Sequence, residues 1–121
     1  MELRDLQRER SELTAAIEQW RRDWESRDTA RYMSSYAKAF RSGDDNFGSW
    51  MDQKMRVNAG KSWIKVDLQD MAIYRYPRES DFVEVTFTQD YRSNNLSNAM
   101  KKRQYWVKEG GRWKIVYEGS A

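Results

Sequence analysis

A chain of 121 residues that contains neither cysteine nor histidine excludes several kinds of site at once. Thiol nucleophiles, serine–histidine triads, cysteine or histidine zinc sites and imidazole pH switches all need one of the two missing residue types. The 22 basic and 19 acidic residues give a net charge of +3, a slight excess and not the concentrated positive charge typical of nucleic-acid-binding proteins. We therefore expect no metal, no cofactor and no nucleic acid partner.

The composition favours one compact domain over residues 1–121. Apolar residues make up 39% of the chain, and six Trp, seven Tyr and four Phe supply large packing units. No apolar run approaches the roughly 18 residues that span a bilayer, and residues 1–10 are charged where a signal peptide would be apolar. We expect no membrane span and no signal peptide.

The first third of the chain has the periodicity of amphipathic helices. Apolar residues three, four or seven apart predict a helix from Glu2 to about Ser26. Asp28 is a candidate N-cap for a second helix, in which Tyr32, Tyr36 and Phe40 recur every four residues. The prediction is two helices within residues 1–42, the second ended by Gly43.

A short loop and a third helix come next. Residues 43–48 have the composition of a loop, and Ser49 followed by Asp52 has the spacing of a capping box. The predicted helix covers residues 49–59, includes Trp50 and ends at Gly60.

From residue 63 to residue 118 the period changes to two, which is typical of strands. Ile64, Val66 and Leu68 alternate with polar residues, and the alternation slips at Asp70 and Met71, which predicts a β-bulge there. Turn-forming residues predict breaks at 76–80, at 94–95 and at the glycine pair 110–111. The strands between them are expected at 82–93, 96–108 and 112–118.

Three helices followed by about four antiparallel strands predict an α+β fold. A strongly curved sheet would wrap the helices into a cone with one open end, and such an opening is a natural pocket.

Several short segments of sequence support a more specific interpretation. They are Trp20-Arg21-Arg22-Asp23-Trp24, Asp28, Tyr32 to Tyr36, Ser49-Trp50, Thr88 to Ser93 and Gly110 to Ile115. Together with the order of the elements, they resemble the NTF2-like (SnoaL-like) superfamily. More narrowly, they resemble the domain found C-terminal to the catalytic unit of some bacterial L,D-transpeptidases and related cell-envelope proteins.

The resemblance implies an NTF2-like cone with an open pocket and, in this group, no chemistry of its own. It also implies a periplasmic or cell-envelope location, the cytoplasm being the alternative if the resemblance fails. The implied partner is a peptidoglycan peptide or a neighbouring catalytic domain, and a homodimer through the sheet face is common in the superfamily.

Polar residues on an inward strand face are the best candidates for a binding site. Gln89 and Tyr91 share the face of Val83, Val85 and Phe87, so the alternation that buries the apolar residues also turns both inward. Burying these groups unpaired costs about 1 to 3 kcal/mol each, so we expect them to pair with each other, with helix tyrosines or with a ligand.

The sequence leaves two alternatives for the side chains that face inward from the strand at 100–108. One set is Lys102, Gln104 and Trp106, and the other is Arg103, Tyr105 and Val107. The resemblance favours the first set. Aromatic residues at helical spacing are also typical of a simple core. With no catalytic residue assigned, the predicted pocket is lined by Tyr36, Trp50, Gln89, Tyr91, Lys102 and Gln104.

An acid–base enzyme is the alternative to a non-catalytic binding or accessory domain that assists peptidoglycan processing. A small-molecule isomerase or dehydratase of this fold would need a carboxylate inside the cone with its pKa raised by burial. Strand parity turns Asp67, Glu84 and Asp90 outward, which leaves Asp70 and Glu118 as inward candidates. Neither has an acid partner visible in the sequence.

Overall fold

The computed structural model describes residues 3–42, 45–75 and 82–121, with side chains described for 7–42, 48–75 and 82–121. Its helices are α1 (Leu3–Ser26), α2 (Thr29–Met33) and α3 (Phe47–Ala59). Its strands are β1 (Tyr36–Ser42), β2 (Asp45–Asn46), β3 (Ile64–Arg75), β4 (Phe82–Ser93), β5 (Ser97–Glu109) and β6 (Arg112–Ser120).

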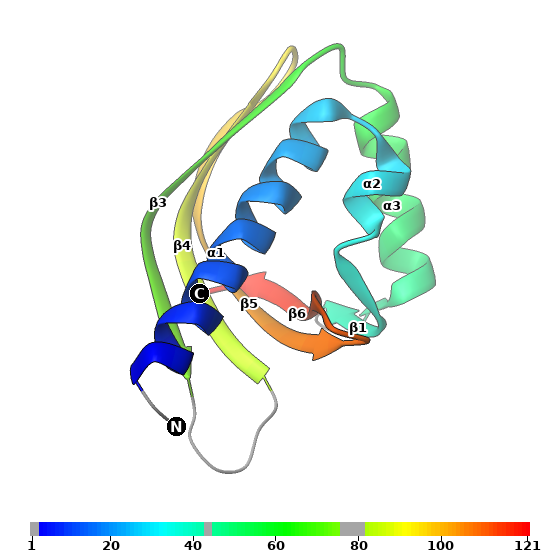
Figure 1. Ribbon diagram of the computed structural model, residues 1–121. Coiled ribbons are helices and arrows are strands. Elements are labelled where there is room, and N and C mark those ends of the chain that lie inside the picture. Colours follow the sequence, from blue (N-terminus) through cyan, green and yellow to red (C-terminus); the bar gives the residue numbers. More distant parts are fainter. Residues whose placement is uncertain (1–2, 43–44, 76–81) are drawn as a thin grey trace.

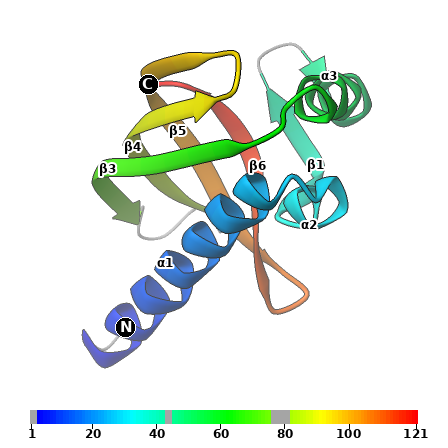
Figure 2. The same ribbon diagram turned by 90° about the horizontal axis from the view of Figure 1, so that it is seen from above.

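The strands form one curved sheet in the order β2-β1-β6-β5-β4-β3, antiparallel except for the parallel pair β1–β6. Figure 1 shows the sheet bending around α1, with α2 and α3 side by side at the other end of the concave side. Seen from above, α1 runs diagonally along one side of the sheet, and β3 is an edge strand of that sheet (Figure 2). The predicted α+β cone of helices packed on a curved sheet is confirmed. The sheet has six strands where about four were predicted, and the pair β1–β6 is parallel.

The second predicted helix is wrong beyond Met33, because residues 36–42 form β1 instead. Asp28 does cap α2, accepting a hydrogen bond from the backbone N–H of Arg31 at 3.2 Å. A spacing of four is close to one helical turn but is also a whole number of strand repeats, so Tyr36 and Phe40 are both buried along β1. The edge of β6 decides between the two, since the N–H of Ile115 donates to the carbonyl of Ser35 at 2.7 Å.

Other predicted boundaries agree closely with the structure. Helix α3 begins two residues before the predicted Ser49 and ends, as predicted, before Gly60. The predicted bulge is confirmed: the β3–β4 register shifts between Gln69 and Ala72, and Asp70 has a φ of 54°. The glycine pair 110–111 makes a two-residue hairpin with φ values of 60° and 81°. The predicted turn at 76–80 and the helix end at Gly43 lie outside the described residues.

Side chains of α1 cover the exposed edge of β3. Arg21 Nη1 donates to the carbonyl of Val66 at 3.2 Å, and the N–H of Val66 donates to Glu25 Oε2 at 2.8 Å. An edge strand has backbone groups without a neighbouring strand, and these two side chains satisfy one residue of that edge. These hydrogen bonds fix α1 against the β3 edge of the sheet.

The core lies between α1 and the concave face. Its largest fully buried side chains are Trp20, Trp106, Tyr32, Phe40, Leu13, Ile17, Ile115, Gln104, Val66, Val83 and Val85. No helix within the described ranges is long and apolar enough to cross a membrane.

Candidate functional site

A buried carboxylate stands at the centre of the concave face. Glu118 on β6 is 4% exposed, and it receives three side chains from neighbouring strands. The hydroxyl of Tyr36 donates to Oε1 at 3.0 Å, Gln104 Nε2 donates to the same oxygen at 2.7 Å, and Lys102 Nζ lies 3.5 Å from Oε2. Trp106 Nε1 in turn donates to Gln104 Oε1 at 3.0 Å, which holds that amide in the orientation that serves Glu118.

The network extends into the helices through Tyr36. Trp20 Nε1 donates to the Tyr36 hydroxyl at 3.0 Å, and the hydroxyl oxygens of Tyr36 and Tyr32 are 3.1 Å apart. A phenol has one proton, and Tyr36 gives its proton to Glu118, so Tyr32 is the donor between the two tyrosines. We refer to the following residues as the Glu118 cluster: Trp20, Tyr32, Tyr36, Lys102, Gln104, Trp106 and Glu118.

Two lysine ammonium groups flank one indole beside this cluster. Lys102 Nζ lies 5.3 Å from the ring centroid of Trp24, and Lys54 Nζ lies 5.5 Å from the same centroid and 5.8 Å from that of Trp50. Cations at this distance are attracted by the negative ring face. Among the described residues, Glu118 is the carboxylate that attracts both ammonium groups, so two positive charges face one negative charge here.

The charges of the cluster shift one another's pKa values. Burial on its own raises the pKa of Glu118, but Lys102 and Lys54, followed by the hydrogen bonds from Gln104 and Tyr36, lower it further than burial raises it. Glu118 therefore carries its charge at neutral pH. Burial lowers the pKa of Lys54, and the attraction of Glu118 opposes that shift. Burial and then the charge of Glu118 raise the pKa of Tyr36 well above its usual value, so its phenol remains a proton donor.

The structure buries all six residues of the predicted pocket. It brings Tyr36, Lys102 and Gln104 together on Glu118, and the ring of Trp50 lies 4.5 Å from that of Tyr36, centroid to centroid. The inward set of β5 is Lys102, Gln104 and Trp106, as the resemblance favoured. Whether these residues bind a ligand remains a prediction.

Gln89 and Tyr91 face inward from β4, as strand parity predicts. They form neither of the protein pairings expected for them, with each other or with helix tyrosines. Among the described residues, Gln89 Oε1, Tyr91 Oη and the nearby Trp24 Nε1 are buried without a hydrogen-bond partner. The rings of Tyr91 and Trp24 are 5.2 Å apart, so at least two of these three polar atoms belong to adjacent side chains.

The structure contradicts the expected inward position of one of the two candidate carboxylates, Asp70. Asp70 is exposed and lines a hollow on the outer surface with Thr86, Thr88 and Lys101, because its left-handed backbone at the bulge turns the side chain away from the cone. Glu118 is inside the cone, as expected.

Lys54 was not singled out from the sequence. It lies four residues after Trp50 on α3, so helical spacing places both side chains on one face. That spacing was the available signal, but a lysine on a helix is usually a solvated residue.

A known protein family matches most of this chain. The family model described as the Cds6 C-terminal NTF2-like domain matches residues 12–119. The chain belongs to this family. A search of the curated proteins finds none that matches this chain.

Solved structures similar to this Cds6-type domain include parts of larger proteins. Bd1075 of Bdellovibrio bacteriovorus is 28% identical with a TM-score of 0.86, over 100% of this chain and 43% of that one. A K307A mutant of the helical cell shape determining protein Pgp2 of Campylobacter jejuni is 24% identical with a TM-score of 0.78, over 88% of this chain and 38% of that one. The chain thus spans less than half the length of either protein.

A putative dehydratase of the NTF2-like family from Streptomyces avermitilis is 12% identical with a TM-score of 0.72. The match covers 90% of this chain and 92% of that one. At that identity the likeness concerns the fold alone.

Proposed function

We propose that this domain is a non-catalytic binding or accessory unit of the bacterial cell envelope. In this proposal it assists peptidoglycan processing of the L,D-transpeptidase type by holding a peptidoglycan peptide or a neighbouring catalytic domain. The similarity to Pgp2, a cell shape determining protein, and the larger size of Pgp2 and Bd1075 support a domain that works beside another unit. A periplasmic or envelope location is part of the same proposal.

The observation that carries the ligand part is the set of buried polar atoms without partners next to the excess positive charge. Tyr91 Oη and Trp24 Nε1 offer donors, Gln89 Oε1 offers an acceptor, and Lys54 and Lys102 attract an anion. A peptide with a free carboxylate has complementary groups: carbonyls for the donors, an amide N–H for the acceptor and a negative charge for the lysines. Leaving the buried atoms unpaired costs about 1 to 3 kcal/mol each, which a ligand would recover.

The environment of Glu118 favours binding over acid–base chemistry. A general base for an isomerase or dehydratase works best with a pKa near the operating pH. The lysines lower the pKa of Glu118 below its ordinary value instead, and Lys102 lies against one of its oxygens. Such a carboxylate is a weak base and a good counter-charge.

Binding of purified muropeptides measures this proposal directly. We expect wild type to bind a stem peptide that ends in a free carboxylate. Gln89→Ala and Tyr91→Phe should each weaken binding roughly fivefold or more, since each removes a hydrogen bond made only in the complex. Tyr105→Phe on the outer sheet face is the matched control and should bind as wild type does.

Equal affinity of all variants, or no binding by wild type, would remove the ligand part of the proposal. Fractionation of cells that express the natural full-length protein tests the location separately. Turnover of a small substrate that Glu118→Gln abolishes would instead support the isomerase or dehydratase alternative.

A further inference from the structure

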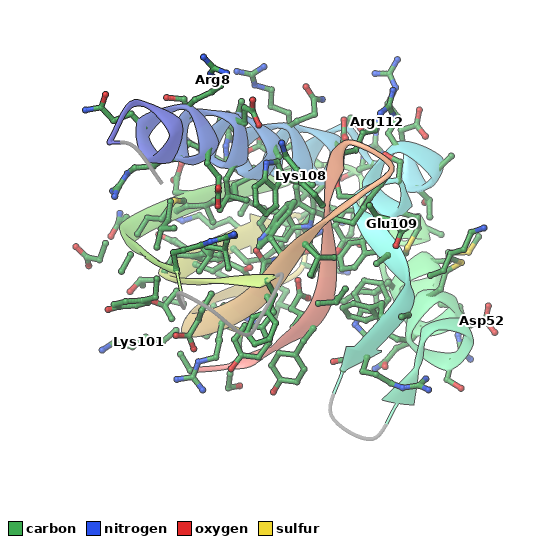
Figure 3. All side chains as sticks on the ribbon, turned by 60° about the horizontal axis from the view of Figure 1, so that its bottom comes forward. Arg8, Asp52, Lys101, Lys108, Glu109 and Arg112 are labelled. Atoms are coloured by element: carbon green, nitrogen blue, oxygen red, sulfur yellow. The ribbon has the colours of Figure 1, made fainter. Side chains whose placement is uncertain are left out.

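A polar hollow lies outside the Glu118 cluster, between α1 and the hairpin that joins β5 to β6. Figure 3 shows the tip of the hairpin, with Lys108, Glu109 and Arg112, reaching up to α1. The ion pair between Lys108 Nζ and Glu12 Oε2 at 3.0 Å ties the two elements together. The hollow has a volume of about 400 Å³, and the small side chains of Ala15 and Ala16 leave it open on the helix side.

One wall of the hollow contains a buried carboxylate that lacks a cationic partner. Asp23 is 5% exposed, and Gln19 Nε2 donates to its Oδ1 at 2.9 Å. No lysine or arginine of the described residues forms an ion pair with it. Asp23 also lies in the last turn of α1, at the negative end of the helix dipole, and that turn contains no basic residue. A carboxylate at the negative end of a helix dipole favours a cation as its partner.

The opposite wall supplies hydrogen-bond donors. Trp113 lines the hollow, and its Nε1 is buried with no hydrogen-bond partner among the described residues. Arg112, at the rim, is exposed and carries a positive charge. Lys114 also lines the hollow; its ammonium donates one hydrogen bond to the carbonyl of Ser34 and keeps its charge and two further donors.

We infer that this hollow binds a short zwitterionic peptide, with its ammonium group on Asp23 and its carboxylate towards Trp113 Nε1 and Arg112. A bare metal cation would use only the Asp23 wall, and a simple anion would use only the Trp113 wall. A zwitterion satisfies both walls at once. The inference goes beyond the proposed function, because it involves neither the Glu118 cluster nor Gln89 and Tyr91.

NMR of the ¹⁵N-labelled chain tests the inference, with the indole N–H of Trp113 as reporter, assigned through Trp113→Phe. Titration with alanyl-alanine should shift this signal saturably. N-acetyl-alanyl-alanine, which lacks the ammonium group, should leave it in place. Asp23→Asn should weaken alanyl-alanine binding roughly tenfold, since it removes a charge-assisted hydrogen bond. Asp67→Asn, the same change at an exposed strand position, should have no effect.

A Trp113 signal that does not respond to alanyl-alanine would overturn the inference, as would equal binding of the acetylated peptide or of Asp23→Asn. Thermal unfolding supplies an independent readout. Asp23→Asn should keep or raise the melting temperature of the free chain, because no cation loses its partner; a marked drop would assign Asp23 a structural role. Gln89→Ala should leave the Trp113 response unchanged, so failure of the interior site and failure of this one are distinguishable.

Discussion

Glu118 and Lys102 form an ion pair in which both side chains are almost fully buried. Taking two charges out of water is costly, and the pair is tolerated because Tyr36 and Gln104 supply further hydrogen bonds to the carboxylate. The same arrangement makes either charge expensive to remove alone.

Neutralising the carboxylate should strongly destabilise the fold. Glu118→Gln leaves Lys102 as an uncompensated buried charge, so the free energy of unfolding should fall by about 3 to 5 kcal/mol. Glu109→Gln in the exposed hairpin should change it by about 0.5 kcal/mol or less. Urea titrations of the two variants decide the matter, and equal effects would contradict the assigned role of Glu118.

The same carboxylate should make stability depend on acidity. The pKa of Glu118 is lower in the folded chain than its ordinary value of 4.5, so the unfolded chain binds the proton first as pH falls. Its contribution to the free energy of unfolding is complete above that value and is lost as the pH falls towards the folded pKa. Urea unfolding from about pH 7 to about pH 3 should show the gap between wild type and Glu118→Gln narrowing only at the acid end. A constant gap would mean that the pKa of Glu118 is not lowered.

Two tyrosines on the concave side should respond differently to loss of the hydroxyl. Tyr36→Phe removes a donor to Glu118 and leaves Trp20 Nε1 without its acceptor, so it should cost about 1 to 3 kcal/mol of stability. Tyr91→Phe removes a hydroxyl with no partner and should be neutral or slightly stabilising. Thermal unfolding of both variants provides the comparison, and a large loss for Tyr91→Phe would reveal a partner for its hydroxyl.

At the scale of elements, the pairing of β5 with β6 positions the partners of Glu118, and its hairpin forms one wall of the hollow beside α1. The two-residue turn fixes the register from Glu109 and Arg112 to Trp106 and Ile115, and a register shift between Tyr105 and Trp106 then places Gln104 opposite Glu118. Both turn residues have positive φ, a conformation that glycine adopts without strain and that residues with a Cβ avoid.

Substitution in this turn should therefore be costly although nothing crowds it. No atom lies within 4 Å of a Cβ added at Gly111, so Gly111→Ala isolates the backbone cost of about 1 to 2 kcal/mol. Gly60→Ala is the matched control, because Gly60 has no positive φ and its added Cβ meets only the carbonyl of Val57 at 3.7 Å. Melting temperatures should fall for the first and hold for the second; the reverse order would refute the turn assignment.

At the scale of the whole molecule, the outer face of the sheet carries a row of aromatic side chains. The ring centroids of Phe82 and Tyr105 are 5.0 Å apart, and those of Tyr105 and Tyr117 are 5.2 Å apart. This row runs across β4, β5 and β6 on the face turned away from the helices. It is the part of the sheet face best suited to a second copy of the chain, which the resemblance to the superfamily implied.

A homodimer through this face remains a prediction, and sedimentation velocity at micromolar concentration tests it. Wild type should sediment as a dimer. Tyr105→Lys should sediment as a monomer with little change in melting temperature, because it places a charge in the interface and Tyr105 is not part of the buried core. A monomeric wild type would remove the dimer from consideration.

Sequence periodicity alone determined much of this protein. Alternation along β4 placed Gln89 and Tyr91 inside the cone, the slip at Asp70 located the bulge, and the glycine pair located the hairpin. These features depend on residues close together in the chain, so local pattern is enough to predict them.

Tertiary structure decided the rest, because it depends on pairings between distant segments. A spacing of four suits a helix and a strand alike, and only the edge of β6 made residues 36–42 a strand. The carboxylate of Glu118 meets Tyr36 across 82 positions of the sequence, and Lys54 approaches from α3. Which charges meet inside the cone, and that Asp23 meets none, follows from strand order and helix packing, which no local pattern encodes.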